Sequence, residues 1–296
     1  MKTQIARGVS LAALAAAVAV IFLMAPPPAR ASTKEGWAPR AVARAPAYEG
    51  SYPSILSSFR MSGVTVPYAR GIFAWSINAP DVYGIFYQST NYNYLYKFQT
   101  SGSLVSTVRL PGAVKLGDAD HPPEGYGGCF AVVDEGAHEL KAYTFTGSFY
   151  GVIRTLPSDV VAYGRGGYTK GYLYLATNNG VVFCYTPTWS LANSYPTGVA
   201  VADLAAGYGY GHYWGDYLEV GSRQAGDPIR VYYGPAGVMA ASFALPGIRS
   251  CGAVGGGQSY WCLRDLGTEI WAYRVAIAGL MEVQTASLGK VKALYK

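Results

Sequence analysis

Charged residues are scarce in this chain and make up 14% of its 296 residues. Histidine occurs three times and cysteine four times, and no C-x-x-C or Cys/His group has metal-ligand spacing. The sequence also lacks G-x-S-x-G, H-E-x-x-H and a phosphate-binding glycine loop. We therefore expect no cofactor and no metal site. These absences disfavour an enzyme, although they leave the question open.

Long apolar runs are absent except within residues 1–31. Lys2 and Arg7 precede the run LAALAAAVAVIFLM, and ARA at 29–31 has the small-x-small pattern of a signal-peptidase site. We predict a signal peptide cut before Ser32, and a secreted, periplasmic or cell-surface protein. An uncleaved anchor is the alternative, because the run approaches the length that spans a bilayer. The mature chain has no predicted transmembrane segment.

Positive charge is modest once the leader is removed. Loss of Lys2, Arg7 and Arg30 leaves 20 basic against 17 acidic residues, without a basic block in the folded part. The composition therefore gives no reason to expect a nucleic-acid partner.

The four cysteines allow one geometrically reasonable disulfide. In SCGAVGGGQSYWC, a hairpin about Gly256-Gly257 would set Cys251 opposite Cys262. Two buried thiols that pack as small apolar side chains are an equal alternative. The sequence does not decide the pairing of Cys129 and Cys184.

Strand and turn formers are abundant, with 37 glycines and 26 tyrosines, and no apolar period of 3.6 residues follows the leader. One motif returns as LYKF, LKAY, VFCY, IRVY and IWAY. Its aromatic anchors are spaced by 45, 42, 47 and 41 residues. Leu-Pro or Tyr-Pro follows each of the first four anchors. The anchors are Phe98, Tyr143, Tyr185, Tyr232 and Tyr273.

The repeat predicts an all-β chain folded as a β-propeller of four-stranded antiparallel blades. Glycine and alanine on the first strand of each unit fit an innermost strand close to the axis. A sandwich or a β-helix would not show this period. We interpret the anchors as packing residues between blades.

The chain ends predict how the ring closes. Residues 48–63 resemble the second half of a unit, and SILSSFRM within them would supply the outer strand of the last blade. Five blades follow, with six as the alternative. We assign the propeller to residues 48–286, a linker to 32–47 and a carboxy-terminal extension to 287–296.

The unit resembles propeller repeats of exported bacterial proteins, broadly those of the NHL and streptogramin-lyase-like families. The resemblance rests on the h-h-x-Y/F motif, the glycine turn and LPG. It implies the propeller fold and carries over no catalytic residue, because the Asn-His-Leu signature is missing.

Two stretches hold the candidate ligand-binding residues. DADH places Asp118, Asp120 and His121 within four residues, which suits a metal or a scissile bond, although a solvated turn with aspartate caps is favoured. GYGYGHYWGD holds Tyr210, His212 and Trp214, which would suit stacking on a sugar or a peptide. The favoured alternative there is an inner strand whose tyrosines fill the gap between blades.

Three functional hypotheses follow. The first is an exported, non-catalytic binding or scaffold module for a surface glycan, polymer or protein. The second is a secreted carbohydrate-active hydrolase or lyase that uses axial carboxylates such as Asp118, Asp203 and Glu219. The third is a structural component of the cell envelope.

Overall fold

The computed structural model describes residues 54–65, 68–74, 81–166, 171–206, 217–222, 224, 227–243, 259–265 and 269–276. They all belong to one compact unit of the chain, residues 44–296. These residues form 19 β-strands without a helix among them. None of them therefore belongs to a helix able to cross a bilayer. The all-β prediction is confirmed.

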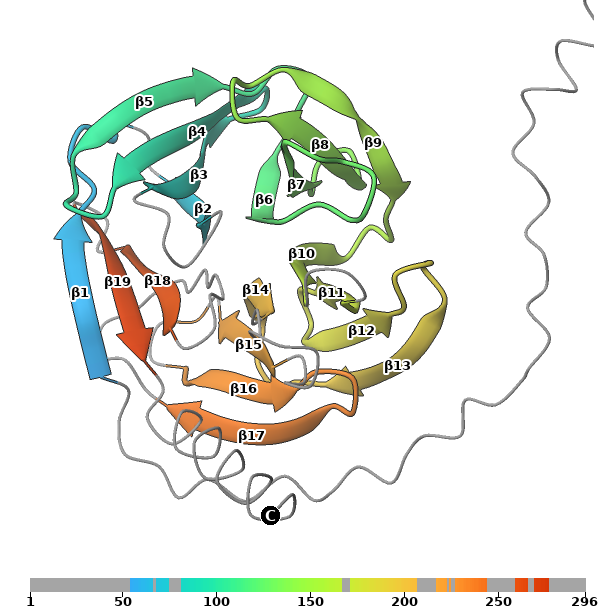
Figure 1. Cartoon of the computed structure of the whole chain (residues 1–296). Coiled ribbons are helices and arrows are strands. Elements are labelled where there is room, and N and C mark those ends of the chain that lie inside the picture. Colours follow the sequence, from blue (N-terminus) through green and yellow to red (C-terminus); the bar gives the residue numbers. More distant parts are fainter. Residues whose placement is uncertain are drawn as a thin grey trace, which may run out of the picture. The chain divides into compact units, whose positions relative to one another are not determined.

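The strands form five antiparallel sheets arranged as blades around an axis (Figure 1). Blade 1 contains β2 (Tyr68–Phe73), β3 (Asp81–Ser89), β4 (Tyr92–Gln99) and β5 (Leu104–Arg109). Blade 2 contains β6 (Leu116–Asp120), β7 (Cys129–Asp134), β8 (Glu139–Thr144) and β9 (Phe149–Thr155). Blade 3 contains β10 (Val160–Arg165), β11 (Leu173–Thr177), β12 (Val181–Tyr185) and β13 (Leu191–Pro196). Blade 4 contains β14 (Val201–Ala206), β15 (Tyr217–Ser222), β16 (Ile229–Tyr233) and β17 (Val238–Phe243).

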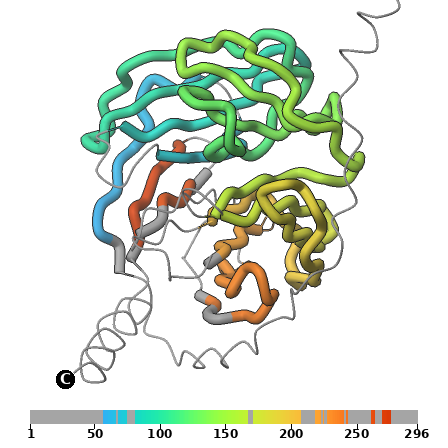
Figure 2. Tube along the Cα trace, turned by 45° about the vertical axis from the view of Figure 1, so that its right-hand side comes forward, coloured from blue at the N-terminus to red at the C-terminus, as the bar shows by residue number. Residues whose placement is uncertain are grey.

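The fifth blade joins the two ends of the propeller. Its described strands are β18 (Ser259–Asp265), β19 (Ile270–Ala276) and β1 (Ser54–Arg60), in the order β1-β19-β18. Ser58 pairs with Tyr273 in this sheet, and β1 lies alongside β19 in both ribbon views (Figures 1 and 2). The predicted closure by an N-terminal outer strand is confirmed, and the ring has five blades rather than six.

Equivalent residues follow the outer strands of the closing blade and of blade 1. Met61 and Leu110 are both buried, and their amides donate to the Ile270 and Asn93 carbonyls. Gly63 and Gly112 then both adopt positive φ, at 81° and 70°. Met61-Ser62-Gly63 and Leu110-Pro111-Gly112 thus occupy corresponding positions in the two blades.

All five aromatic anchors lie on the strand that pairs with the outermost strand of their blade. Phe98, Tyr143 and Tyr232 are buried, whereas Tyr185 and Tyr273 are half-buried. In blades 1 to 4 the register against the outermost strand shifts at the anchor itself. The repeated aromatic therefore marks a β-bulge as well as a packing position.

The apolar core lies between neighbouring blades. Phe73 of blade 1 packs against Phe130 of blade 2 with ring centroids 5.3 Å apart. Phe59 of β1 contacts Trp261 at 5.6 Å and Phe98 at 6.0 Å, so the closing strand also packs against blade 1. Each blade thus buries its faces against the next ones, as the repeat predicted.

The first strands carry small residues because they lie close to the axis. A Cβ atom built at Gly71 would lie 3.1 Å from the Ala119 nitrogen and 3.2 Å from the Asp118 Cα. Glycine at this position thus permits close contact between β2 and β6.

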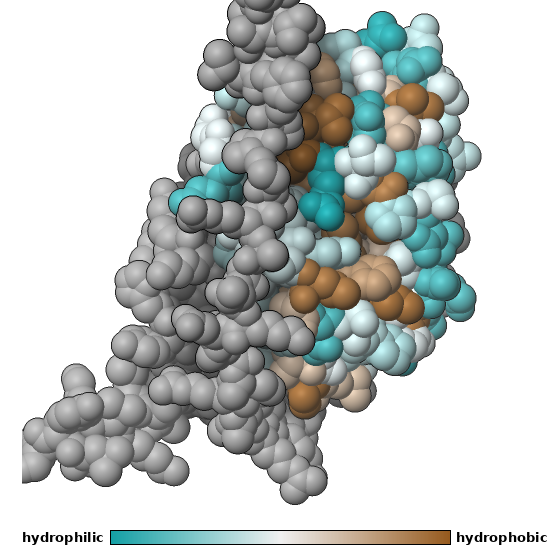
Figure 3. All heavy atoms as spheres, turned by 90° about the vertical axis from the view of Figure 1, so that its right-hand side faces the viewer, coloured by the Kyte–Doolittle hydropathy of each residue, from teal (hydrophilic) through white to brown (hydrophobic). Residues whose placement is uncertain are grey.

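The outermost strands expose most of the large apolar side chains found on the described surface. Figure 3 views the side of the ring that carries β9 and β13, and it shows such residues scattered among polar ones. Tyr68 and Tyr92 lie elsewhere, on β2 and β4. The outer-strand residues are Leu56, Leu104, Val105, Phe149, Tyr150, Val152, Leu191, Val238 and Met239.

Candidate functional site at the propeller axis

The DADH stretch forms the end of β6 and the residue after it, on the innermost strand of blade 2. Asp118, Asp120 and His121 are 0%, 3% and 5% exposed. The expected aspartate caps are present, but the expectation of a solvated turn was wrong. The capped amides belong to β10 and β14 of the neighbouring blades and to the DADH stretch itself.

Asp118 connects three blades. Its Oδ2 atom accepts hydrogen bonds from the Tyr163 amide of blade 3 and the Leu204 amide of blade 4, both at 3.0 Å. Its Oδ1 atom accepts from the Ala119 amide at 2.7 Å. A typical intramolecular hydrogen bond contributes about 0.5–1.5 kcal/mol net. The side chain therefore fastens three inner strands at the axis.

Asp120 repeats this contact one step along the strand. Its Oδ2 atom accepts from the Arg165 amide at 2.8 Å, two residues after Tyr163 on β10. Its Oδ1 atom contacts the His121 amide at 2.6 Å and the His121 Nδ1 atom at 2.9 Å. Alternate amides of a strand point to the same edge. The two aspartates therefore accept hydrogen bonds from amides on the edge of β10 that does not pair with β11.

His121 and the residue after it continue the contact with blade 3. The Tyr163 hydroxyl donates to the His121 carbonyl at 3.0 Å, and an Arg165 guanidinium nitrogen donates to the Pro122 carbonyl. The three DADH candidates are thus brought together, in contacts that hold blade 2 against blade 3.

Asp203 of blade 4 lies beside Asp118 near the axis, where the two carboxyls are close enough to share a proton. Asp203 is 1% exposed. Two carboxyls can share a hydrogen bond only when one of them carries a proton. Burial raises the pKa of Asp118 to about 8, and the charge of Asp120 adds to this effect. The bonds from Asp203 and from the Leu204 and Tyr163 amides oppose it.

Glu219 is the third carboxyl of this region and is fully buried. Asp203 pairs with Gly221 and Ala205 pairs with Glu219, so both acidic side chains lie on the same face of blade 4. The Glu219 Oε1 atom is 3.8 Å from the Cys262 Sγ atom of blade 5, and Oε2 has no hydrogen-bond partner among the described residues. Burial raises the pKa of Glu219 to about 8, and the contact with Cys262 opposes the rise.

Asp118 and Asp203 thus meet near the axis, with Glu219 on the next strand of blade 4, yet all three side chains are buried instead of lining an open mouth. Both oxygens of Asp118 are occupied by backbone amides. Across the described part of the chain, no group of three or more His, Cys, Asp or Glu residues could hold a metal ion. The arrangement suits holding the blades together and retaining protons.

The other sequence candidates lie outside the described residues. These are Tyr210, His212 and Trp214, and also Cys251 of the predicted disulfide. The pairing of Cys251 with Cys262 therefore stays a prediction.

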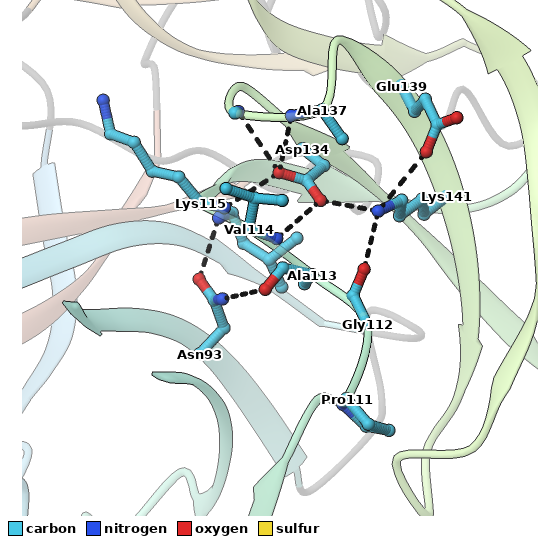
Figure 4. Close-up of polar contacts among 12 residues, drawn as sticks. Asn93, Pro111, Gly112, Ala113, Val114, Lys115, Asp134, Ala137, Glu139 and Lys141 are labelled. Atoms are coloured by element: carbon cyan, nitrogen blue, oxygen red, sulfur yellow. Dashed lines mark hydrogen bonds and ion pairs between the residues drawn. The ribbon is translucent and has the colours of Figure 1, made fainter. Parts of the chain in front are cut away.

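A polar network between blades 1 and 2 was not foreseen (Figure 4). Asp134, fully buried at the end of β7, accepts from the amides of Val114 and Lys115 at 2.9 Å each and from the Lys141 ammonium at 2.7 Å. Lys141 also donates to the Gly112 carbonyl at 2.8 Å. Burial acts to raise the pKa of Asp134, but these donors lower it overall.

Asn93 holds the same interblade connection from the side of blade 1. Its Nδ2 atom donates to the Ala113 carbonyl at 3.0 Å, and its Oδ1 atom accepts from the Leu116 amide at 2.8 Å. A single asparagine in a tyrosine-rich strand matches no sequence motif, so its role could not be predicted. Asn93 becomes buried and hydrogen-bonded only because blades 1 and 2 are adjacent.

The exposed aromatics include a group on blade 2 close in space to the loop that follows DADH. Phe149 and Tyr150 begin β9 and are 47% and 59% exposed. The ring of Tyr150 lies 5.9 Å from that of half-buried Tyr126, in an edge-on arrangement. We call Tyr126, Phe149 and Tyr150 the blade 2 aromatic group.

No family model matches the chain, and no curated protein matches its sequence. A streptogramin B lyase structure aligns with 15% identity and a TM-score of 0.38, covering 71% of this chain and 65% of that one. Virginiamycin B lyase from Staphylococcus aureus aligns with 12% identity and a TM-score of 0.39, covering 71% and 67%. BBS1N in complex with ARL6DN aligns with 12% identity and a TM-score of 0.38, covering 77% and 62%.

The chain therefore spans less than two thirds of the length of the BBS1N and streptogramin B lyase structures. Identities and TM-scores this low transfer neither a residue nor an activity to this chain.

Proposed function

We propose that this chain is an exported β-propeller that serves as a non-catalytic binding or scaffold module for a surface glycan, polymer or protein. One observation carries the proposal. The carboxyls that a propeller hydrolase would present to substrate are buried, and those of Asp118 and Asp120 accept backbone amides of neighbouring blades. Export is inferred from residues 1–31 alone.

The blade 2 aromatic group is the contact surface that we assign to this module. Exposed aromatic faces stack on sugar rings and anchor protein interfaces with little loss of side-chain entropy. Phe149 and Tyr150 are both more than two fifths exposed, so they can contact a partner without unfolding of the blade.

The proposal is tested by binding of the purified exported protein to a glycan array and to isolated cell-envelope polymer. We expect saturable binding that Phe149→Ser and Tyr150→Ser each weaken at least tenfold. Tyr150→Ser should change Tm little, whereas Phe149→Ser should lower it, because the Phe149 ring lies 5.5 Å from that of Tyr143. Val105→Ser, an exposed aliphatic position on blade 1, is the matched control and should bind normally. Binding that survives both blade 2 substitutions would remove this surface from consideration.

The hydrolase or lyase hypothesis keeps one observation in its favour, which is the meeting of Asp118 and Asp203 near the axis. This hypothesis requires that the protein cleaves a glycan and that Asp203→Asn abolishes the cleavage without unfolding the protein. Product release by the wild-type protein, absent in that variant, would replace the binding proposal with this one.

A further inference from the structure

The carboxyl cluster, defined as Asp118, Asp203 and Glu219, combines three acidic side chains in blades 2 and 4. Each is at most 1% exposed. No lysine or arginine forms an ion pair with Asp118 or Glu219 within the part of the chain that the structure describes. A buried carboxylate without a countercharge is so costly that the group retains its proton instead.

Three arginines of the surrounding strands contact groups outside the cluster. Arg70 of β2 lies over the rings of Tyr87 and Tyr68, at 5.2 and 5.9 Å. Arg165 of β10 donates to the Pro122 carbonyl, and Arg230 of β16 donates to the Thr197 carbonyl. Other titratable groups on the described strands around the cluster are Asp120 of β6 and His121 directly after it, which contact each other, Tyr163 of β10, Tyr232 and Tyr233 of β16, and Cys262 of β18.

The geometry requires protons at two places. A hydrogen bond between the neighbouring carboxyls of Asp118 and Asp203 can join the inner strands of blades 2 and 4 only while one proton lies between them. Glu219 faces blade 5 through Cys262, and ionisation would leave its charge in a buried interface where Oε2 has no described donor. Loss of either proton therefore acts on a contact between blades.

We propose that the carboxyl cluster is a proton-dependent clasp, in which one proton shared by Asp118 and Asp203 and a second on Glu219 hold the ring closed. The clasp loosens when these protons leave, so the propeller is most stable in mildly acidic surroundings.

The direction of the effect follows from proton linkage. Burial raises the pKa of Asp118 and of Glu219 to about 8, from ordinary values near 4 that apply in the unfolded chain. The folded state therefore binds more protons than the unfolded state between about pH 4 and 8. Stability is fully present below the unfolded pKa and is lost as pH rises toward the folded pKa. Asp134 acts in the opposite sense. Because its pKa is lowered in the folded state, the stability that it contributes is lost as the pH falls into more acidic solution.

Thermal unfolding of the purified full chain from pH 5 to pH 9 tests the clasp. We expect the Tm of the wild-type protein to fall continuously across this range. Each retained proton makes the unfolding equilibrium constant rise up to about tenfold per pH unit. Asp203→Asn supplies an amide that donates to ionised Asp118, and Glu219→Gln is neutral at every pH. The double variant should therefore show a nearly flat profile.

Asp81→Asn is the matched control, because Asp81 is a partly exposed carboxylate paired with Lys97 at 2.8 Å on blade 1. It should lower Tm by a similar amount at each pH and keep the wild-type slope. A wild-type Tm independent of pH over this range would overturn the clasp, and so would an unchanged slope in the double variant.

Two further measurements decide the matter if a variant fails to fold. Calorimetric unfolding of the wild-type protein at pH 6.5, in buffers of different ionisation enthalpy, should report release of about two protons. Release of none would contradict the proposal. A rise in Tm on adding calcium chloride at pH 8, reversed by EDTA, would indicate that these carboxyls bind a cation instead of protons. That result would also overturn the proposal.

Discussion

Tyr143 and Tyr232 each join a blade to the connection that leaves the preceding blade. The Tyr143 hydroxyl donates to the Pro111 carbonyl at 2.9 Å, and the Tyr232 hydroxyl donates to the Thr197 carbonyl at 2.9 Å. Both carbonyls lie directly after an outermost strand, in the proline-marked connection to the next blade. The aromatic and the proline of the repeat are therefore two halves of one contact, made across the blade interface.

Substitution of the anchors tests this contact at the residue scale. Tyr143→Ala should lower the free energy of unfolding by about 3–5 kcal/mol, because it leaves a cavity between blades. Tyr143→Phe should cost about 1–3 kcal/mol, because the Pro111 carbonyl loses its buried donor. Tyr185→Ala should cost less than Tyr143→Ala, since Tyr185 is half-buried. Urea unfolding measures all three, and equal losses at Tyr143 and Tyr185 would contradict the packing assignment.

At the scale of elements, β1 makes the strand pairing with the greatest separation along the chain among the described strands. It pairs with β19 more than 200 residues away, from Ser54 opposite Ala276 to Arg60 opposite Trp271. Phe59 adds ring contacts to Trp261 and Phe98, so the strand contributes to the apolar core on both sides. Without β1, the edge of β19 would be open.

Deletion of residues 48–63 should therefore abolish folding or cause aggregation, because it removes the closing strand and exposes the edge of β19. Expression level, gel filtration and thermal unfolding of the truncated chain check this expectation. Deletion of residues 32–47, the predicted linker, is the control and should leave Tm nearly unchanged. A normal melting transition after loss of 48–63 would show that β1 does not close the ring.

At the scale of the whole molecule, the inner strands should be the most protected part of the ring. The amides of Tyr163 and Leu204 donate to Asp118 at the axis, so three blades must separate before these amides exchange. Hydrogen exchange of the wild-type chain should show peptides from β10 and β14 opening only by global unfolding. Peptides from β5 and β9, whose outer edges are unpaired, should exchange sooner. Equal protection of inner and outer strands would contradict an axial clamp.

The repeat, the blade count and the closing strand were predictable from the sequence because each rests on a local pattern. Alternating strands and an aromatic anchor recur every 41 to 47 residues, and a proline follows the outer strand after each of the first four anchors. Small residues such as Gly71 also marked the inner strands, because steric crowding at the axis acts on the sequence directly. The fold thus followed from packing requirements that every blade repeats.

The role of the acidic residues was decided only by the tertiary structure. Asp118 and Asp203 lie 85 residues apart, and closure of a five-bladed ring is what brings their strands to one axis. The donors to Asp118 and Asp120 are backbone amides, which leave no trace in a sequence. Asn93 and Asp134 are equally ordinary until two blades enclose the loop between them. The sequence pattern indicates which residues face a neighbouring blade. The partner of each buried polar group, however, depends on which strands the closed ring brings next to it.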